Sequence, residues 1–240
     1  MAVLDKVYTQ ARIGLSRTGT SVSTKDALEF RLAHAFARDA VYSSLNLASL
    51  SVEIENVGLH ALFLKSLATN RENYLKRPDY GRKLDNKSIL KLGDQQHGYD
   101  IAIIVSEGLS AIAIEKNFIK VFELLVSMYL KDGLSVGPVC IVEQGRVAVA
   151  DQIGELIAAK LSVIFIGERP GLSSPDSMGC YLTYQPKLGL TDESRNCVSN
   201  IRDNGMSSAN AASKLFYLSK EALRKKLSGI HLKDEQGLIV

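Results

Sequence analysis

The chain has 240 residues, of which 46% are hydrophobic and 23% are charged. This composition excludes wholesale disorder and suffices for one large domain or two modest ones. The net charge of +3 is too small to predict a nucleic-acid partner, and the apolar runs are too short for a membrane span or a signal peptide. Three cysteines without pairing or metal-ligand spacing indicate neither a disulfide framework nor a zinc site, and they favour the reducing cytoplasm.

The first part of the chain is predicted to be mainly helical. Residues 24–47 have the period of an amphipathic helix, with Thr24 as its cap. The residues that form its apolar face are Leu28, Leu32, Phe36 and Ala40. A short alternation around Ala61 indicates a strand. The polar segment 71–83 is broken by a proline and a glycine, and it is predicted to be a loop at a domain junction.

After about residue 97, short apolar runs alternate with helical patterns. The predicted order is strand 100–105, helix 115–131, strand 139–142, helix 151–160 and strand 162–166. This alternation predicts βαβ units and a parallel sheet with helices on both faces. A last helix is predicted to begin at Ser207 or Ser208 and to end at Gly229. The predicted fold class is therefore α/β, with a smaller, mainly helical domain over residues 1–96 and a Rossmann-like domain over residues 97–240.

Each of the three predicted strands is followed by a loop that contains glycine. These loops span residues 106–110, 143–146 and 167–171. Parallel α/β sheets bind ligands at the carboxyl ends of their strands, so the three loops together outline a candidate site. Glycine is also needed in short connections for backbone geometry alone, and both interpretations stay open at this point.

Several common signatures are missing from the sequence. It contains no G-x-G-x-x-G, no G-x-x-x-x-G-K-[ST] phosphate loop and no G-x-S-x-G nucleophile elbow. The four histidines lack metal-ligand spacing, so no metal site is predicted. Asp94 and His97 resemble the Asp-x-His-x-x-Gly signature of some cobalamin domains only superficially, because two residues separate them. Tyr74 and Tyr80 lie among basic residues, which could stack on RNA but are more typical of a solvated junction or a subunit contact.

Several unusual strings follow one another along the chain. They are ARIG at 11–14, YLKRPDYGRKL at 74–84, SEGLSA at 106–111, GRV at 145–147, DQIGE at 151–155, GERPGL at 167–172, CY at 180–181 and NCVSNIR at 196–202. Together they closely resemble the light chain of ethanolamine ammonia-lyase. The similarity extends in order from about residue 11 to residue 231.

The resemblance implies a hetero-oligomeric lyase that depends on adenosylcobalamin and converts ethanolamine into acetaldehyde and ammonia. It also implies a large partner subunit, a TIM barrel that holds the substrate, with the corrin between the two subunits. Three cobalamin contacts of the family match Val147, Glu168 and Cys197 of this chain. Glu168 can accept hydrogen bonds from corrin amides, whereas Val147 and Cys197 can pack on the apolar rim. No catalytic residue is expected in this chain, because the radical steps belong to the partner.

Two other interpretations remain open. A stand-alone Rossmann-like, nucleotide-binding enzyme would need a phosphate-binding glycine loop after its first strand, which SEGLSA fits poorly. A purely structural subunit would contact no ligand. The chain departs from the family between Pro186 and Asn196, which leaves the contacts near Cys197 open. The resemblance places the protein in the cytoplasm, either free or inside a bacterial microcompartment, with neither nucleic acid nor membrane as a partner.

Overall fold

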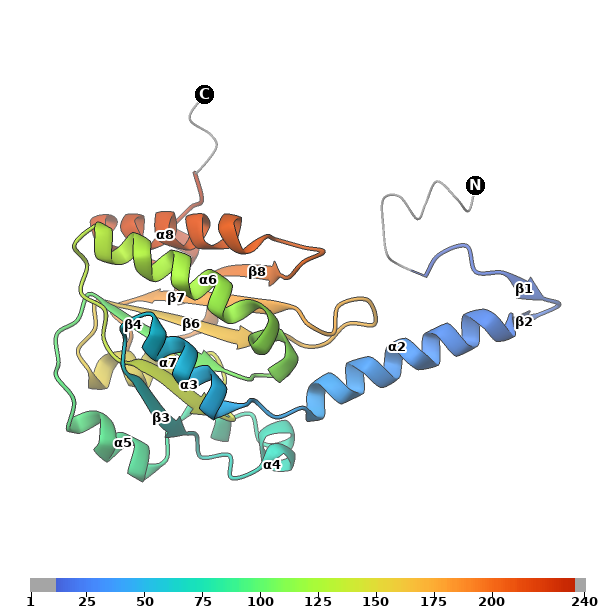
Figure 1. The fold of residues 1–240 in the computed structure, drawn as a ribbon, viewed down its shortest axis with the longest axis horizontal. Helices are drawn as coiled ribbons and strands as arrows, with labels where there is room; N and C mark the ends of the chain where they lie inside the picture. Colours follow the sequence, from blue (N-terminus) through green and yellow to red (C-terminus); the bar gives the residue numbers. More distant parts are fainter. Residues whose placement is uncertain (1–11, 236–240) are drawn as a thin grey trace.

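A central sheet with helices on both faces forms the body of the molecule (Figure 1). The structure, a computed structural model, describes residues 12–235. Residues 1–11, at the start of the predicted N-terminal domain, and residues 236–240 lie outside the described residues. The mixed α/β class predicted from the sequence is confirmed. No helix of residues 12–235 has both the length and the apolar character needed to cross a membrane.

The central sheet has six strands in the order β3-β5-β4-β6-β7-β8. Their bounds are β3 Ala61–Lys65, β4 Ile101–Ser106, β5 Val139–Glu143, β6 Leu161–Gly167, β7 Met178–Tyr184 and β8 Asn196–Ile201. The first four strands in this order are parallel, and β7 and β8 are antiparallel additions. Since β4 and β6 are buried along their whole length, their sequences are continuous apolar runs. The predicted parallel strands are confirmed, whereas β7 and β8 have no counterpart in the prediction.

The helices divide between the two faces of the sheet. The helices of the body are α3 Leu47–Asn56, α4 Arg71–Lys76, α5 Asn86–Gly93, α6 Ala111–Lys131, α7 Val149–Leu156 and α8 Ser208–Lys225. α3, α6 and α8 pack on one face, where the rings of Phe118, Phe122 and Phe165 meet. α5 and α7 cover the other face through Leu92 and Ile153. Each face of the sheet therefore has its own hydrophobic core. This arrangement is expected when the helices that connect the strands lie on both faces of the sheet.

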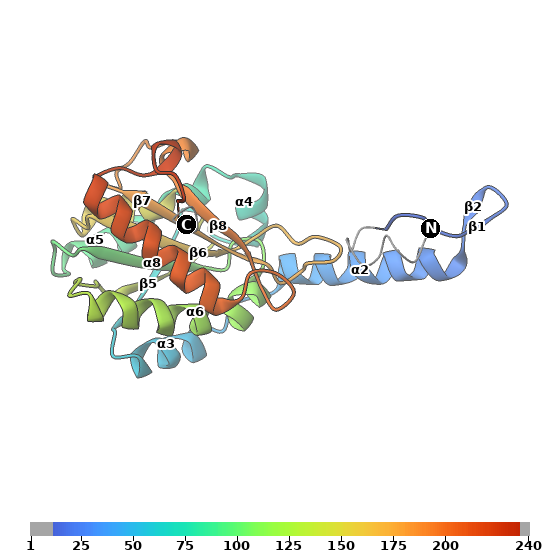
Figure 2. The ribbon, with the colours of Figure 1, turned by 90° about the horizontal axis from the view of Figure 1, so that it is seen from above.

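The predicted helix over residues 24–47 is present, but it ends earlier than predicted and has a different cap. α2 (Thr24–Tyr42) is capped by Ser23, whose hydroxyl accepts a hydrogen bond from the Asp26 N–H, and Thr24 is its first residue. α2 stops before Asn46, whose side chain caps the separate helix α3. α2 projects from the body, with the short strands β1 (Arg17–Thr18) and β2 (Ser21–Val22) at its tip (Figure 2). Its predicted apolar face is exposed except at Ala40.

The segment 71–83 is also not the loop that its polar composition predicts. It contains α4 and a 3₁₀ turn over Tyr80–Arg82. Asn70 caps α4, and Glu72 and Lys76 form an ion pair across one turn of it. A cap together with an i,i+4 pair stabilises a short helix even where no apolar periodicity is visible.

The end of α8 differs from the prediction by one turn. Ser207 caps the helix as predicted, but the helix ends at Lys225. Lys226 has a φ of 58° and closes the helix with its N–H on the carbonyl of Ala222. Gly229 belongs instead to a further 3₁₀ turn, Gly229–His231, which packs against another such turn, Asp192–Ser194.

The predicted division between residues 96 and 97 remains a prediction, with one qualification. β3 lies before residue 96 and pairs with β5 over its whole length. The central sheet therefore includes one strand from the N-terminal side of the proposed boundary. The Rossmann-like assignment of residues 97–240 likewise remains a prediction.

Candidate functional site

The strand order places a topological switch point at the carboxyl end of β4. From β4 the chain crosses to β5 on one side, and from β5 it crosses to β6 on the other side of β4. The connections that leave β4 and β5 therefore diverge to opposite faces of the sheet, where α6 and α7 lie. In open α/β sheets a ligand binds in the crevice that such divergence creates.

A pocket of about 420 Å³ lies at this position. Its lining residues are Tyr74, Leu109, Arg146, Val147, Ile166, Gly167, Glu168, Arg169 and Tyr181. Residues from all three predicted loops are among them, so the three loops do meet at one place. The structure brings Val147 and Glu168 together in this pocket, whereas Cys197 lies beside it on β8.

Glu168 is held in place by one of its two carboxylate oxygens. Its Oε2 accepts a hydrogen bond from the Ser177 hydroxyl at 2.5 Å and another from the Asn200 N–H at 3.3 Å. The backbone N–H of Glu168 donates to the carbonyl of Ser177 at 2.9 Å. Within residues 12–235 no hydrogen bond occupies Oε1. The side chain is therefore fixed in direction and keeps one acceptor for a ligand in the pocket.

Cys197 reaches the pocket through Tyr181. The two residues are cross-strand partners of β8 and β7, so their side chains lie side by side. Desolvation raises the pKa of the Cys197 thiol, and the Glu168 carboxylate contributes in the same direction. The thiol is therefore neutral at physiological pH and suits an apolar contact better than nucleophilic attack.

Another part of the pocket lining is the Tyr74 ring, which lies close to two guanidinium groups. The Arg71 and Arg146 guanidinium carbons lie 4.7 Å and 4.4 Å from the centre of the Tyr74 ring. Arg146 also donates from Nη2 to the Tyr74 carbonyl at 2.8 Å. Burial raises the pKa of Tyr74 to about 12, so the ring stays neutral. The sequence shows Tyr74 among basic residues, but no local pattern predicts that Tyr74 contacts Arg146.

Glu107 joins the loops after β4 and β5. It is buried, and its Oε1 accepts a hydrogen bond from the Gln144 N–H at 2.7 Å. Burial raises the pKa of Glu107, while this bond lowers it. Arg71 crosses the same region and donates to the Gly108 carbonyl at 2.7 Å. The loops that form the pocket are thus tied to each other and to α4.

The glycines of the loops are required by packing between the loops. A Cβ on Gly108, which has a φ of +54°, would overlap the Gly167 carbonyl and the Ile166 side chain. A Cβ on Gly145 would lie 2.9 Å from the Ser106 hydroxyl oxygen. The N–H of Leu109 already donates to the Gly167 carbonyl. This closed packing supports the geometric interpretation of the glycines and does not support a phosphate-binding loop after β4.

We expect Gly108→Ala to lower the free energy of unfolding by at least about 2 kcal/mol more than Gly133→Ala does. Both glycines have positive φ, but nothing lies within 4 Å of a Cβ on Gly133. The control variant therefore contains the backbone strain alone, whereas the Gly108 variant adds the clash. Urea unfolding of both variants measures the difference. Equal losses of unfolding free energy would show that the two loops move apart to accommodate the methyl group without loss of stability.

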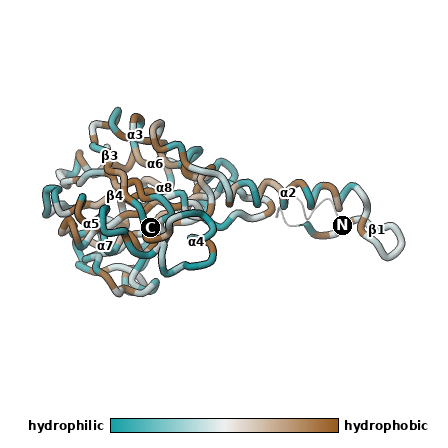
Figure 3. The backbone as a smooth tube through the Cα atoms, turned by 90° about the horizontal axis from the view of Figure 1, so that it is seen from below, coloured by the Kyte–Doolittle hydropathy of each residue, from teal (hydrophilic) through white to brown (hydrophobic). Residues whose placement is uncertain are grey.

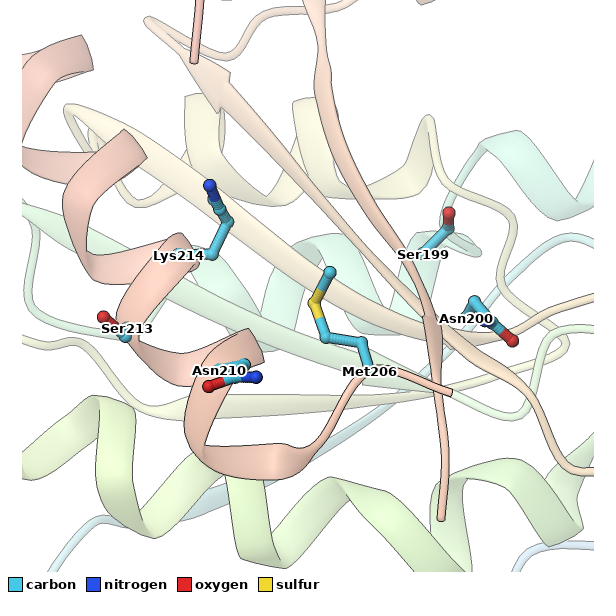
Figure 4. A pocket seen from close by; sticks show the side chains of 6 residues that line it. All are labelled: Ser199, Asn200, Met206, Asn210, Ser213 and Lys214. Carbon is cyan, nitrogen blue, oxygen red and sulfur yellow. The ribbon is translucent and has the colours of Figure 1, made fainter. Parts of the chain in front are cut away.

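A second hollow of about 690 Å³ lies between β8 and the start of α8 (Figure 4). Its lining side chains are Ser199, Asn200, Met206, Asn210, Ser213 and Lys214. None of the three predicted residues lines it, although Asn200 also holds Glu168. Because this hollow lies at the outer edge of the sheet and away from the switch point, we assign the candidate site to the smaller pocket.

Comparison with known proteins agrees with the resemblance. Residues 4–233 match the family described as ethanolamine ammonia-lyase light chain. The ethanolamine ammonia-lyase small subunit of Pseudomonas aeruginosa (strain LESB58) is 52% identical over 231 residues, which cover 95% of this chain and 85% of that protein. Its counterpart from Azotobacter vinelandii is 50% identical over 95% of this chain and 86% of that protein. This chain therefore belongs to the ethanolamine ammonia-lyase light-chain family, whose members are the small subunits of that lyase.

Proposed function

We propose that this chain holds one edge of adenosylcobalamin in ethanolamine ammonia-lyase, and that a large subunit covers the cofactor from the opposite side. The large subunit, a TIM barrel by family resemblance, would bind ethanolamine and contain the radical steps. Residues 97–240 would act as the Rossmann-like, cobalamin-binding domain, preceded by the mainly helical residues 1–96. The enzyme would work in the cytoplasm, free or inside a microcompartment.

The observation that carries this proposal is the state of Glu168. Its carboxylate lies in a pocket at the switch point of the sheet, with Oε2 held by the protein and Oε1 left to a ligand. A corrin carries amide side chains around an apolar ring, so it needs both hydrogen-bond acceptors and donors at its edge. Glu168 supplies the acceptor, and the guanidinium group of Arg146, which also lines the pocket, supplies the donor.

The apolar part of the pocket also fits a corrin edge. Val147 and Leu109 offer aliphatic surface, and Tyr181 presents an aromatic face beside Cys197. Cobalamin is much larger than a pocket of about 420 Å³, so only one edge can enter and the rest must be covered by another chain. When bound, the cofactor supplies the radical chemistry, and the residues of this chain bind and orient it.

Co-expression of this chain with an ethanolamine ammonia-lyase large subunit tests the proposal. We expect the two chains to co-elute in gel filtration and to form acetaldehyde from ethanolamine only when adenosylcobalamin is added. The large subunit alone should retain much less of the cofactor on a desalting column than the pair does. Equal retention with and without this chain would instead support a purely structural subunit, and activity of this chain alone would support a stand-alone enzyme.

A further inference from the structure

α2 leaves most of its apolar side chains uncovered. Nearly half of the exposed large hydrophobic side chains of residues 12–235 lie between residues 13 and 42. On the helix itself, Leu28, Leu32 and Phe36 are 58%, 56% and 55% exposed, and Ala40 is its only buried residue. Figure 3 shows hydrophobic stretches continuing along α2 beyond the body of the molecule. Exposed apolar surface of this extent on a soluble domain marks an interaction site.

The apolar side chains occupy more than one side of α2. Leu28, Leu32 and Phe36 are spaced by four residues and share one face. Phe30, which is 47% exposed, lies two residues away from Leu28 and therefore about 200° around the helix axis. A helix that is apolar on opposite sides is typical of an element enclosed by other protein. In proteins most of the stability of a helix comes from tertiary packing of its apolar face and not from helix propensity.

We propose that α2 is a docking arm that inserts into a groove of the large subunit of the lyase. This inference rests on the partner proposed above, but it does not depend on where cobalamin binds. The arm is defined here as residues 24–42. The structure assigns it to the partner on three grounds, which are its area, its charges and its position relative to the pocket.

The lateral surface of the arm is large enough for a stable interface if the partner encloses the arm, but not if the arm only pairs along one face with a second copy. A helix of 19 residues is about 28 Å long and about 11 Å across, so its lateral surface is on the order of 900 Å². A standard interface buries about 800 Å² on each partner. Enclosure of the arm would therefore supply a stable interface by itself. Pairing of two copies along one face would bury only about a third of that surface, which is too little.

The charges of the arm argue against a membrane as its partner. The basic residues Lys25, Arg31 and Arg38 are matched in number by the acidic residues Asp26, Glu29 and Asp39. Helices that lie on membranes are rich in lysine and arginine on their polar face. A balanced set of charges suits the polar rim of a protein interface instead.

The base of the arm is joined to the candidate cofactor site. Arg71 donates from Nε to the Val41 carbonyl at 2.6 Å and from Nη1 to the Gly108 carbonyl at 2.7 Å. Tyr42 lies on a small cavity that Glu107 and Gln144 also line. A partner that covers the pocket would therefore meet the base of α2 as well. One continuous interface can include both the corrin edge and the arm.

Substitution of the exposed face of the arm tests the inference. We expect the triple variant Leu28→Gln, Leu32→Gln, Phe36→Gln to bind the large subunit at least about 100-fold more weakly in sedimentation experiments without cobalamin. Glutamine keeps helix propensity, and the three side chains are exposed, so thermal unfolding of the isolated chain should not change. The matched control is Leu90→Gln, Leu130→Gln, Ile230→Gln, which removes equally exposed apolar groups elsewhere.

The outcomes separate this inference from the proposed function. Weak assembly of the arm variant together with normal assembly of the control supports the docking arm. Assembly of the arm variant as tight as wild type overturns it and leaves the cofactor site untouched. Loss of self-association by the arm variant, with unchanged binding to the large subunit, would also overturn it in favour of a second copy. If the wild-type chain itself does not bind the large subunit, the proposed function fails and the docking arm with it.

Discussion

Replacement of Arg195 by methionine is expected to lower the free energy of unfolding by about 3–5 kcal/mol at pH 7. Arg195 precedes β8 and forms an ion pair with Asp151 of α7, and both side chains are almost fully buried. Its Nη1 also donates to the Thr191 carbonyl at 2.5 Å. The variant would leave the Asp151 carboxylate buried without its counter-charge. It would also release the segment that leads to Cys197.

The loss in this variant should depend on pH. Burial raises the pKa of Asp151 to about 6 in the folded chain, against 3.8 for the free side chain, although Arg195 lowers it. Without Arg195 the folded pKa rises further. Because wild-type Asp151 itself titrates at about 6, both proteins lose stability from about pH 4 to pH 6, and only the variant continues to lose stability above pH 6. Urea unfolding at several pH values should show the smallest loss in acid.

A double variant supplies the control for the ion pair. Asp151→Leu together with Arg195→Met removes both charges, and such replacements by apolar groups are often neutral. We expect the double variant to recover most of the stability that the single variant loses. A single-variant loss below about 1 kcal/mol, or a double variant no more stable than the single one, would show that the pair does not hold this segment.

Replacement of Glu168 by alanine is expected to weaken cobalamin binding by the assembled enzyme about 10–100-fold. A hydrogen bond to a charged group contributes about 1.5–3 kcal/mol, and each 1.4 kcal/mol is a factor of ten. The KM for ethanolamine should change little, because the carboxylate is expected to contact the cofactor and not the substrate. Acetaldehyde formation measured against cofactor concentration gives the apparent affinity.

Two variants sharpen this measurement. Glu168→Gln keeps an acceptor oxygen and should lose less affinity than the alanine variant. Glu123→Ala removes an exposed carboxylate of α6 that does not line the pocket, and it should leave the affinity unchanged. Thermal unfolding of each variant checks that the lost bond from Ser177 has not loosened β7. An unchanged apparent affinity of Glu168→Ala would remove this residue from the site.

The parallel part of the fold could be predicted because burial on both faces leaves a simple trace in the sequence. β4 and β6 contain almost only apolar residues, and the helices between them have clear periods. β8 could not be predicted in this way, because it is an edge strand with exposed polar residues such as Ser199 and Asn200. The short helix α4 was concealed by its polarity. The break between α2 and α3 depends on Ser43, where the backbone becomes extended, and on Asn46, which caps α3, and both look like any other polar residue in the sequence.

The candidate site could be predicted in outline only. The carboxyl ends of parallel strands must share one edge of the sheet, so the loops with Val147 and Glu168 could be expected to meet. The contribution of Tyr74 depends on packing of α4 against the loop after β5, which no local pattern encodes. The apolar period of α2 predicts an apolar face, which this chain leaves exposed apart from Ala40. It cannot tell whether the rest of this chain or another chain covers that face.

A structure of the two-subunit complex with adenosylcobalamin would show whether the turns that leave the parallel strands hold a corrin edge. We expect cobalamin atoms within contact distance, about 4 Å, of Val147, Glu168 and Cys197, with a corrin amide on the Glu168 carboxylate and the large subunit on the far side. Cobalamin bound far from all three side chains would contradict this expectation.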